Sequence, residues 1–370
     1  MNVSGKLALK MLYRGLRNKL EQRPISISFE ITHYCTANCW HCNWGGPFKG
    51  ETRLQAEDYA AICRELRPVV SHISGGEPLA RGDVYDITRA MANPGGLPWM
   101  ILVSNCAAMN VDKYEKLRDA GINQFSISLD FPDDRHSDFR RIPKLFQKMD
   151  RVIPELTARA NNDVSINTCI TAWNYRDVPD MVKLMRKWRT PINFSVYTPL
   201  RMSDPEGTPR EDQLKEVREV FQKIVDMKNE GYPIYTSERV MWKYYKFFTE
   251  GGIPGCQAGR RFLVINPDGR LTPCAMVMAY YNDQRDMLKD FTSSNTCEMC
   301  YISTRANTEK KLADFIADNW DMLARQILPW RKPRSLELLT EDPAADGNGS
   351  GPTKTKDEQE TEASQSAAAQ

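Results

Sequence analysis

Residues 35–42 read Cys-Thr-Ala-Asn-Cys-Trp-His-Cys and place three thiols within eight residues. Free cysteines are normally dispersed as small buried hydrophobic side chains, so this clustering needs another reason. An odd number of thiols is also a poor basis for a disulfide framework in a chain of 370 residues. The spacing therefore predicts a metal site.

The identity of the metal is left open by this spacing. Zinc prefers four closed ligands, and His33 or His41 could join the three cysteines to complete such a site. An iron–sulfur cluster held by three thiolates would instead leave one iron open to a small molecule. The choice between them depends on the rest of the chain.

The composition is that of an ordinary globular protein, with 41% hydrophobic and 26% charged residues. A formal net charge of +2 gives no reason to expect nucleic acid as a partner. No window is long and apolar enough for a transmembrane helix, and no signal-peptide pattern follows the basic N-terminus. We therefore expect a cytoplasmic protein, in which ten cysteines favour metal ligation over disulfides.

The segment before the cysteines alternates apolar and polar residues, as Ile-Ser-Ile-Ser-Phe-Glu-Ile-Thr at 25–32, and predicts a β-strand. The cysteine loop then follows the carboxyl end of this strand. Parallel α/β folds place their chemistry at such strand ends.

A βα repeat continues for about 200 residues and predicts a parallel sheet, open or partly closed as a barrel. Its expected strands lie at 25–32, 69–74, 99–104, 124–130, 164–171 and 192–200. Its expected helices lie at 54–66, 82–92, 111–120, 143–158, 178–188 and 211–229.

The repeat ends near residue 232, where aromatic residues at 232–248 predict a packed junction. Segments 262–265 and 270–274 flank the turn Asn-Pro-Asp-Gly and predict a β-hairpin. After a stretch without pattern, we expect a last helix at 308–328 and a disordered tail at 336–370.

The first segment, residues 3–20, predicts a helix with a narrow basic stripe and a wide apolar surface. We expect this helix to pack on the protein's own core or under its barrel. An interfacial helix in peripheral contact with a membrane is the alternative.

Two motifs at neighbouring strand ends give the chain a family resemblance. Cys35-x3-Cys39-x2-Cys42 and Gly75-Gly76-Glu77-Pro78, joined to the βα repeat, resemble the radical S-adenosylmethionine (radical SAM) enzymes over residues 25–305. The resemblance implies a partial (β/α)6 barrel and a 4Fe–4S cluster on the three cysteines. The open iron would bind S-adenosylmethionine, whose reductive cleavage yields a 5′-deoxyadenosyl radical that abstracts hydrogen.

The resemblance also implies cofactor-binding residues, each of which has a purely structural alternative. His41 would lie beside the adenine, Gly75 and Gly76 would let the backbone approach the ligand, and Glu77 or nearby carbonyls would meet its ammonium group. Arg140, in a His-x-x-Phe-Arg pattern, would offer a cation to its carboxylate. The remaining candidates follow strand ends or complete the glycine motif: Pro78, Asn105 and Ser128.

Three further cysteines stand outside both cysteine sets. Cys106 occupies a position where many relatives have glycine, and we interpret it as a small buried side chain, with a redox or hydrogen-donor role as the alternative. Cys63 and Cys169 are interpreted as core residues.

The second cysteine set resembles the auxiliary-cluster domains of part of this family, in their short "twitch" form. Its members are Cys256, Cys274, Cys297 and Cys300. Four thiolates would close the coordination of one auxiliary 4Fe–4S cluster, and a structural zinc site is the alternative. The expected divisions are an N-terminal helix at 1–24, the barrel at 25–231, a small C-terminal auxiliary-cluster domain at 232–305, a C-terminal helix at 306–335 and a tail at 336–370.

These features predict an enzyme that oxidises, crosslinks or rearranges a small-molecule, peptide or lipid substrate at a C–H bond. It would need an electron donor such as flavodoxin or ferredoxin. A lipid-modifying enzyme at a membrane surface and a non-catalytic iron–sulfur redox sensor are the alternatives. Nucleotide hydrolysis is disfavoured, because Gly45-x4-Gly50 continues with Glu51-Thr52 and lacks the phosphate-loop lysine.

Overall fold

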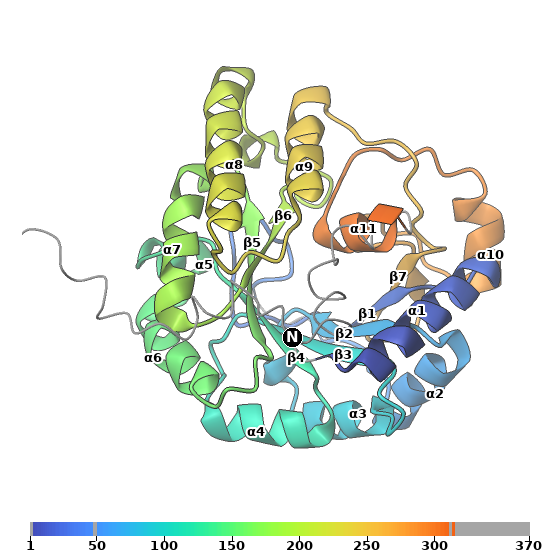
Figure 1. Cartoon of the computed structure of the whole chain (residues 1–370). Helices are drawn as coiled ribbons and strands as arrows, with labels where there is room; N and C mark the ends of the chain where they lie inside the picture. Colours follow the sequence, from blue (N-terminus) through green and yellow to red (C-terminus); the bar gives the residue numbers. More distant parts are fainter. Residues whose placement is uncertain (1–2, 47–49, 311–312, 315–370) are drawn as a thin grey trace, which may run out of the picture. The chain divides into compact units, whose positions relative to one another are not determined.

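The computed structural model describes residues 3–46, 50–310 and 313–314. Its centre is a sheet in which the six strands of the βα repeat run parallel to one another, as predicted (Figure 1). These strands are β1 Ser26–Thr32, β2 Val70–Gly75, β3 Trp99–Ser104, β4 Gln124–Ser128, β5 Val164–Ile170 and β6 Ile192–Val196. With β7 Phe262–Ile265 and β8 Leu271–Thr272, the full order of the sheet is β6-β5-β4-β3-β2-β1-β7-β8.

Helices alternate with these strands and cover one face of the sheet. They are α2 Ala56–Leu66, α3 Val84–Met91, α4 Val111–Ala120, α6 Leu145–Thr157, α7 Val178–Trp188 and α8 Leu214–Asn229, with the short α5 Arg135–Arg140 before α6. Local sequence sets their ends: the Asn110 side chain caps α4, and Gly121, at φ +118°, ends it. The expected helix at 211–229 begins as a 3-10 turn over Glu211–Gln213 before α8.

The strand register sorts side chains onto two unlike faces. The face toward the helices is apolar and buried, with residues such as Phe29, Leu102 and Phe194 in the main core. The opposite, concave face carries polar side chains at register-matched positions, because successive side chains point to opposite sides of a strand. These positions are Ser26, Ser28, Glu30, His72, Ser74, Gln124, Ser126, Ser128, Ser165, Asn167, Cys169, Asn193 and Ser195.

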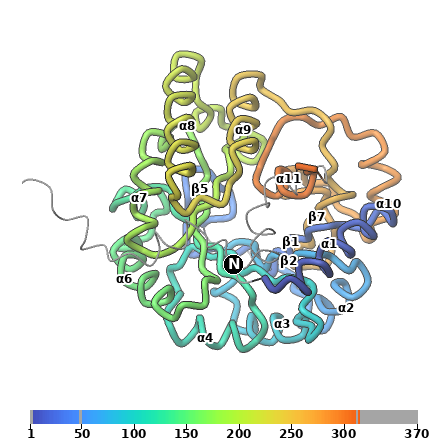
Figure 2. The backbone as a smooth tube through the Cα atoms, in the orientation of Figure 1, coloured from blue at the N-terminus to red at the C-terminus, as the bar shows by residue number. Residues whose placement is uncertain are grey.

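The segment expected to be only a packed junction contains a full helix, α9 Glu238–Glu250. Ser237 caps it by accepting a hydrogen bond from the Val240 amide, and α9 lies beside α8 (Figure 2). The aromatic residues Tyr244, Phe247 and Phe248 are buried, which confirms their packing role. The expected strand at 192–200 also ends earlier than predicted, at Val196.

The predicted hairpin is present as β7 Phe262–Ile265 and β8 Leu271–Thr272. β7 pairs in parallel with β1, so the hairpin continues the barrel sheet, which the sequence pattern did not indicate. The unpatterned stretch holds α10 Gln284–Met287 and a π-helical turn over Leu288–Thr292. A further short helix, α11, spans Ser303–Thr308, so Thr308 ends a helix where one was expected to begin. Most of the expected helix at 308–328, and the tail at 336–370, lie outside the described residues.

The N-terminal helix α1 spans Gly5–Leu20, and the Ser4 hydroxyl caps it by accepting from the Leu7 amide. The Asn18 side chain donates to the Pro24 and Arg67 carbonyls at 2.7 and 2.9 Å, so α1 docks at the amino-terminal ends of β1 and β2. This placement confirms packing under the sheet for one side of the helix. Within the part of the chain that the structure describes, no helix is long and apolar enough to cross a membrane.

Candidate active site

The first cysteine set lies on the loop that follows β1. Cys39 is buried, and Cys35 and Cys42 are half-buried. The Cys35 thiol accepts a hydrogen bond from the Ala37 amide at 3.4 Å. The C-terminal turn of α5 holds the loop from the side, since the Asn38 amide donates to the Arg140 carbonyl at 3.1 Å.

The glycine motif after β2 lies directly against this cysteine loop. The Gly76 amide donates to the Thr32 carbonyl at 2.7 Å, and the Glu77 amide donates to the Tyr34 carbonyl at 2.8 Å. A Cβ on Gly75 would lie 2.1 Å from the Thr32 oxygen, and one on Gly76 would lie 2.0 Å from the Tyr34 oxygen. Close approach of two segments of this chain is thus sufficient to require both glycines. Their approach to a ligand stays a prediction, as does the role of Pro78, which is buried in the 3-10 turn Pro78–Ala80.

Glu77 ties the two motifs to the end of β3. Its buried carboxylate accepts hydrogen bonds from the Ser104 hydroxyl, the Asn105 amide and the Leu79 amide. Burial raises the pKa of this carboxyl, although the three donors oppose the rise. With three donors from the chain itself, the carboxylate acts first as a connector between strand ends.

Asn105 carries this connection on to the cysteine loop. Its side-chain amide lies 3.8 Å from the Cys35 sulfur and donates to the Thr36 hydroxyl at 3.1 Å. Its side-chain oxygen accepts from the Ala107 amide at 2.8 Å. Glu77 and Asn105 therefore form a chain of contacts from β2 through β3 to the first cysteine.

Arg140 is a buried cation next to the same loop. Its Nε donates to Asp130 at 2.6 Å, and Asp130 is itself 1% exposed. Burial lowers the pKa of Arg140, but Asp130 and the nearby thiols of Cys39 and Cys35 outweigh it and leave this pKa above its ordinary value. Burial alone would likewise raise the pKa of Asp130, yet Arg140 together with nearby histidines lowers it. The expected cation is present, and its first partner is Asp130.

His41 extends from the cysteine loop over Phe139, with ring centroids 5.2 Å apart. Its Nδ1 is buried without a hydrogen-bond partner among the described residues, and burial lowers the pKa of the imidazole to about 4. A neutral, partly unpartnered ring of this kind suits an aromatic ligand. His33, the other candidate for a zinc ligand, instead stacks on Trp44 at 3.9 Å and pairs with Glu30 at 3.3 Å.

Two thiols outside the motifs differ in their placement. Cys106 is fully buried and has φ +69°, which explains why glycine suits this position. The core interpretation of Cys169 is wrong: it is half-buried and pairs in register with Ser195 on the polar face, near Asp130 and Cys42. Its place in the β5 alternation, two residues after Asn167, could have shown this. Cys63 lies in the main core as expected, and Ser128, half-buried, pairs in register with Asn167 on the polar face.

The fold brings the second cysteine set together from three segments. Cys256 and Cys274 share a small buried cluster with Phe262, and Cys297 packs against it. Burial is the main reason that the pKa of Cys274 rises to about 11 and that of Cys300 to about 12, and neighbouring thiols of the set add to both shifts. The packing of Cys256, Cys274 and Cys297 in one cluster places these three thiols in the same region of the fold.

Arg305, which was not among the predicted site residues, holds the segments of this set together. It is fully buried, and its guanidinium donates to the carbonyls of Cys300 and Pro254 at 2.5 and 2.9 Å. It also pairs with Glu309 at 2.9 Å, whose carboxylate accepts from the Gln257 amide. The i, i+4 spacing of Arg305 and Glu309 was visible in the sequence, but the burial of Arg305 was not.

Both sets are chemically suited to iron–sulfur clusters, because they offer buried or half-buried free thiols, some with backbone N–H groups donating to sulfur, as the Met276 amide does to Cys274 at 3.4 Å. Among residues 3–46, 50–310 and 313–314, no three His, Cys, Asp or Glu side chains already converge as a metal site. The support for metal binding therefore comes from the shared loop, the burial and the donor chemistry.

The chain is similar in sequence to a known family and to several characterised proteins. Residues 29–185 match the family model described as the Radical SAM superfamily. The chain is 29% identical over 169 residues to an AdoMet-dependent heme synthase of Methanosarcina barkeri, covering 44% of this chain and 48% of that protein. It is 23% identical over 300 residues to a PqqA peptide cyclase of Methylobacterium nodulans, covering 76% of each. The chain spans less than half the length of the heme synthases that it matches.

Solved structures show the same fold at low identity. SuiB of Streptococcus suis, solved with S-adenosylmethionine, matches with a TM-score of 0.58 at 14% identity, covering 74% of this chain and 67% of that one. A structure titled native anSMEcpe, with AdoMet and a peptide, matches with a TM-score of 0.53 at 14% identity, covering 82% and 98%. These likenesses confirm the α/β fold of the radical SAM type.

Proposed function

We propose that the chain, whose residues 29–185 match the Radical SAM superfamily, is an enzyme that uses this domain to abstract hydrogen from a peptide substrate. In this proposal Cys35, Cys39 and Cys42 hold a 4Fe–4S cluster. Such a cluster, when bound, supplies the electron that cleaves S-adenosylmethionine to methionine and a 5′-deoxyadenosyl radical.

The residues around the cysteine loop would bind and orient S-adenosylmethionine. Arg140 lies beside Cys35 and Cys39 and would attract the carboxylate of the ligand while remaining paired with Asp130. His41 would stack near the adenine. Because Glu77 already accepts three hydrogen bonds, carbonyls near the glycine motif are the better partners for the ammonium group.

Cys256, Cys274, Cys297 and Cys300 would hold an auxiliary 4Fe–4S cluster with a closed set of thiolate ligands. Such a set favours electron transfer over direct binding of substrate. Its proposed role is to accept the electron that remains on the substrate after hydrogen abstraction. Arg305 is buried beside these thiols and donates to the carbonyls of Cys300 and Pro254, which supports a site that excludes substrate.

The polar concave face of the sheet is the observation that carries the substrate class. Side chains there already pair through hydrogen bonds, such as Asn193 to Asn167 at 3.2 Å and Gln124 to Ser165 at 2.9 Å. Apolar Val70, Ile101 and Val103 lie among these polar groups, so the face is mixed rather than lipid-like. A face rich in hydroxyl and amide groups suits the backbone and side chains of a peptide better than a lipid chain. The match to a PqqA peptide cyclase over 76% of this chain, a share larger than residues 29–185, supports the same class.

Anaerobic reconstitution tests the proposal. We expect the reduced protein to convert S-adenosylmethionine to 5′-deoxyadenosine, measured by liquid chromatography. Peptide, metabolite and lipid fractions are then incubated separately, and mass spectrometry follows the loss of a hydrogen pair. A product only from the lipid fraction would overturn the peptide assignment, and absence of cleavage in protein loaded with iron would favour the redox-sensor alternative.

A further inference from the structure

Helix α1 presents three stripes that the helical period separates. Leu7, Gly15 and Asn18 lie on the docked stripe: Asn18 is 2% exposed, and a Cβ on Gly15 would touch Val69. This stripe accounts for one side of the helix only. Of the other two stripes, one faces away from the protein and one borders a pocket beside the docked side.

The stripe opposite the docked one is apolar and exposed. Leu9, Tyr13, Leu16 and Leu20 follow one another at intervals of four, three and four residues, so they share one face. Their exposed fractions are 69, 68, 41 and 85%. A continuous apolar face of this kind, without a partner among the described residues, marks an interaction surface.

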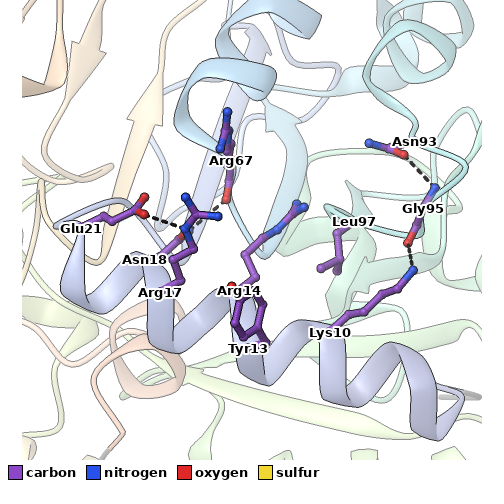
Figure 3. Close-up of a pocket in the computed structure, with 10 residues that line it drawn as sticks. All are labelled: Lys10, Tyr13, Arg14, Arg17, Asn18, Glu21, Arg67, Asn93, Gly95 and Leu97. Atoms are coloured by element: carbon purple, nitrogen blue, oxygen red, sulfur yellow. Dashed lines mark hydrogen bonds and ion pairs between the residues drawn. The ribbon is translucent and has the colours of Figure 1, made fainter.

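The third stripe, between these two, is basic and lines a pocket. Figure 3 shows Lys10, Arg14 and Arg17 along one side of α1, facing the segments that contain Arg67 and Gly95. The pocket has a volume of about 320 Å³, and Glu21 is its one acidic residue. Its lining is therefore strongly cationic.

Part of this charge is not neutralised within the described chain. Arg17 pairs with Glu21 at 2.6 Å, but Arg14 and Arg67 form no ion pair with any described residue. Burial, and then the proximity of Arg67 and Arg17, lower the pKa of Arg14, while Cys63 partly offsets this. Crowded cations beside an open pocket favour an anionic group from outside the chain.

We propose that α1 docks this protein on a membrane with anionic headgroups, the apolar stripe entering the interface and the pocket receiving a headgroup phosphate. The charge complementarity and the adjacent apolar stripe together fit a phospholipid surface.

The fold also determines what this docking can do. α1 lies at the amino-terminal end of β1, whereas the cysteine loop follows its carboxyl end, seven residues away. At the usual rise per residue the two ends are about 20 Å apart. Docking through α1 therefore recruits the enzyme to the membrane and leaves the site open toward the other end for a substrate from solution.

Vesicle co-sedimentation of the full chain tests this surface without any cofactor. We expect binding to phosphatidylcholine vesicles containing phosphatidylglycerol, little binding to phosphatidylcholine alone, and release at high salt. The double variant Arg14→Gln/Arg67→Gln should bind roughly 30-fold more weakly, because each basic residue near the surface contributes about a factor of five. Leu16→Ser/Leu20→Ser should lose binding through its apolar part.

The matched control removes the same charge elsewhere. Lys215→Gln/Arg218→Gln changes two exposed residues of α8 and should bind like the parent protein. Circular dichroism melts establish that each variant is folded. Equal loss in the control, or no binding by the folded full chain, would overturn the proposal. Concentration-dependent dimers that Leu16→Ser/Leu20→Ser abolishes, seen in sedimentation without vesicles, would assign the face to a second copy instead.

Discussion

The two cysteine sets differ in how the chain holds them. Cys35, Cys39 and Cys42 lie on a single loop, which is fixed by backbone contacts to neighbouring strand ends. The four thiols of the second set come from separate segments, which the side chains of Asn295 and the buried Arg305 join. The first set therefore stays open on one side, and the second is enclosed by the chain.

This difference bears on function because an open set can accept a small ligand and an enclosed one cannot. The first set lies beside the concave polar face of the sheet. Cys169, on that face, is near Cys42 as well as Asp130 and Arg140. The second set lies beside the hairpin that extends the sheet beyond β1, with Cys256 before the hairpin and Cys274 after it. Breaking either set alone should reveal whether the two have the separate roles proposed.

The largest effect is expected from removing each set in turn. Cys35→Ala/Cys39→Ala/Cys42→Ala should abolish formation of 5′-deoxyadenosine, because the open iron site is lost. Changing Cys256, Cys274, Cys297 and Cys300 to Ala should leave this cleavage and abolish the substrate product. Iron analysis should give about eight irons in the parent and about four in each variant.

Two results would contradict this division. Unchanged cleavage in the triple variant would refute the first cluster. Zinc in the protein as isolated, with iron near four before and after the fourfold change, would make the second set a structural zinc site.

The second prediction concerns the contact between the cysteine loop and the glycine motif. Gly76→Ala would bring a Cβ to 2.0 Å from the Tyr34 oxygen, so the loop must shift. A displacement of about 1 Å in a catalytic site can cost roughly 100-fold in rate, and we expect a loss of that size in cleavage. The four irons of the second set should remain, at about four per chain.

Gly82→Ala is the control for this change. A Cβ at Gly82 meets nothing within 4 Å, and the residue does not have positive φ. It should keep parental cleavage rates. If both glycine variants lose activity equally, the close approach at Gly76 is not the reason.

Features that depend on residues close together in the chain could be predicted from the sequence, whereas features that join distant segments could not. The first loop, the parallel strands and most helix ends depend on local spacing and alternation, so they were predicted closely; β3, α4 and α7 match to the residue. α9 was missed because its aromatic residues at 242–248 indicate packing more strongly than a helical period.

The remaining features depend on pairing between distant segments. The pairing of β7 with β1 joins residues more than 230 positions apart, such as Ser26 and Phe262, and no local pattern encodes it. The polar face of β5 was encoded in its alternation, but Cys169 was interpreted from its residue type alone. Register, more than residue type, decides on which face a strand residue lies.

The third prediction tests whether the buried Arg305 holds the second cysteine set together. Arg305→Leu removes the partner of Glu309 and of two backbone carbonyls, all in a buried region. Removing one partner of a buried pair typically costs about 3 kcal/mol or more, so the free energy of unfolding should fall by about that amount. Iron at the second set should fall as well, whereas cleavage of S-adenosylmethionine should persist.

Arg285→Leu, on an exposed position of α10, is the matched control and should change the stability by less than about 0.5 kcal/mol. Denaturant unfolding measures both variants. A stability loss as small for Arg305→Leu as for Arg285→Leu would show that Arg305 does not hold the second cysteine set together.

The smallest effect is expected at Cys106, next to the first set but outside its ligands. Cys106→Gly relieves the left-handed conformation at φ +69°, which costs a side-chain-bearing residue roughly 1 kcal/mol, but it loses a buried thiol and adds chain entropy. These terms nearly cancel, so stability should change by less than about 1 kcal/mol, while Cys106→Ala keeps the strain and should be less stable than Cys106→Gly. Both variants should retain cleavage and product formation within about twofold if the thiol is only a packing residue. Loss of product in both folded variants, with cleavage intact, would instead show that this thiol takes part in the reaction after hydrogen abstraction.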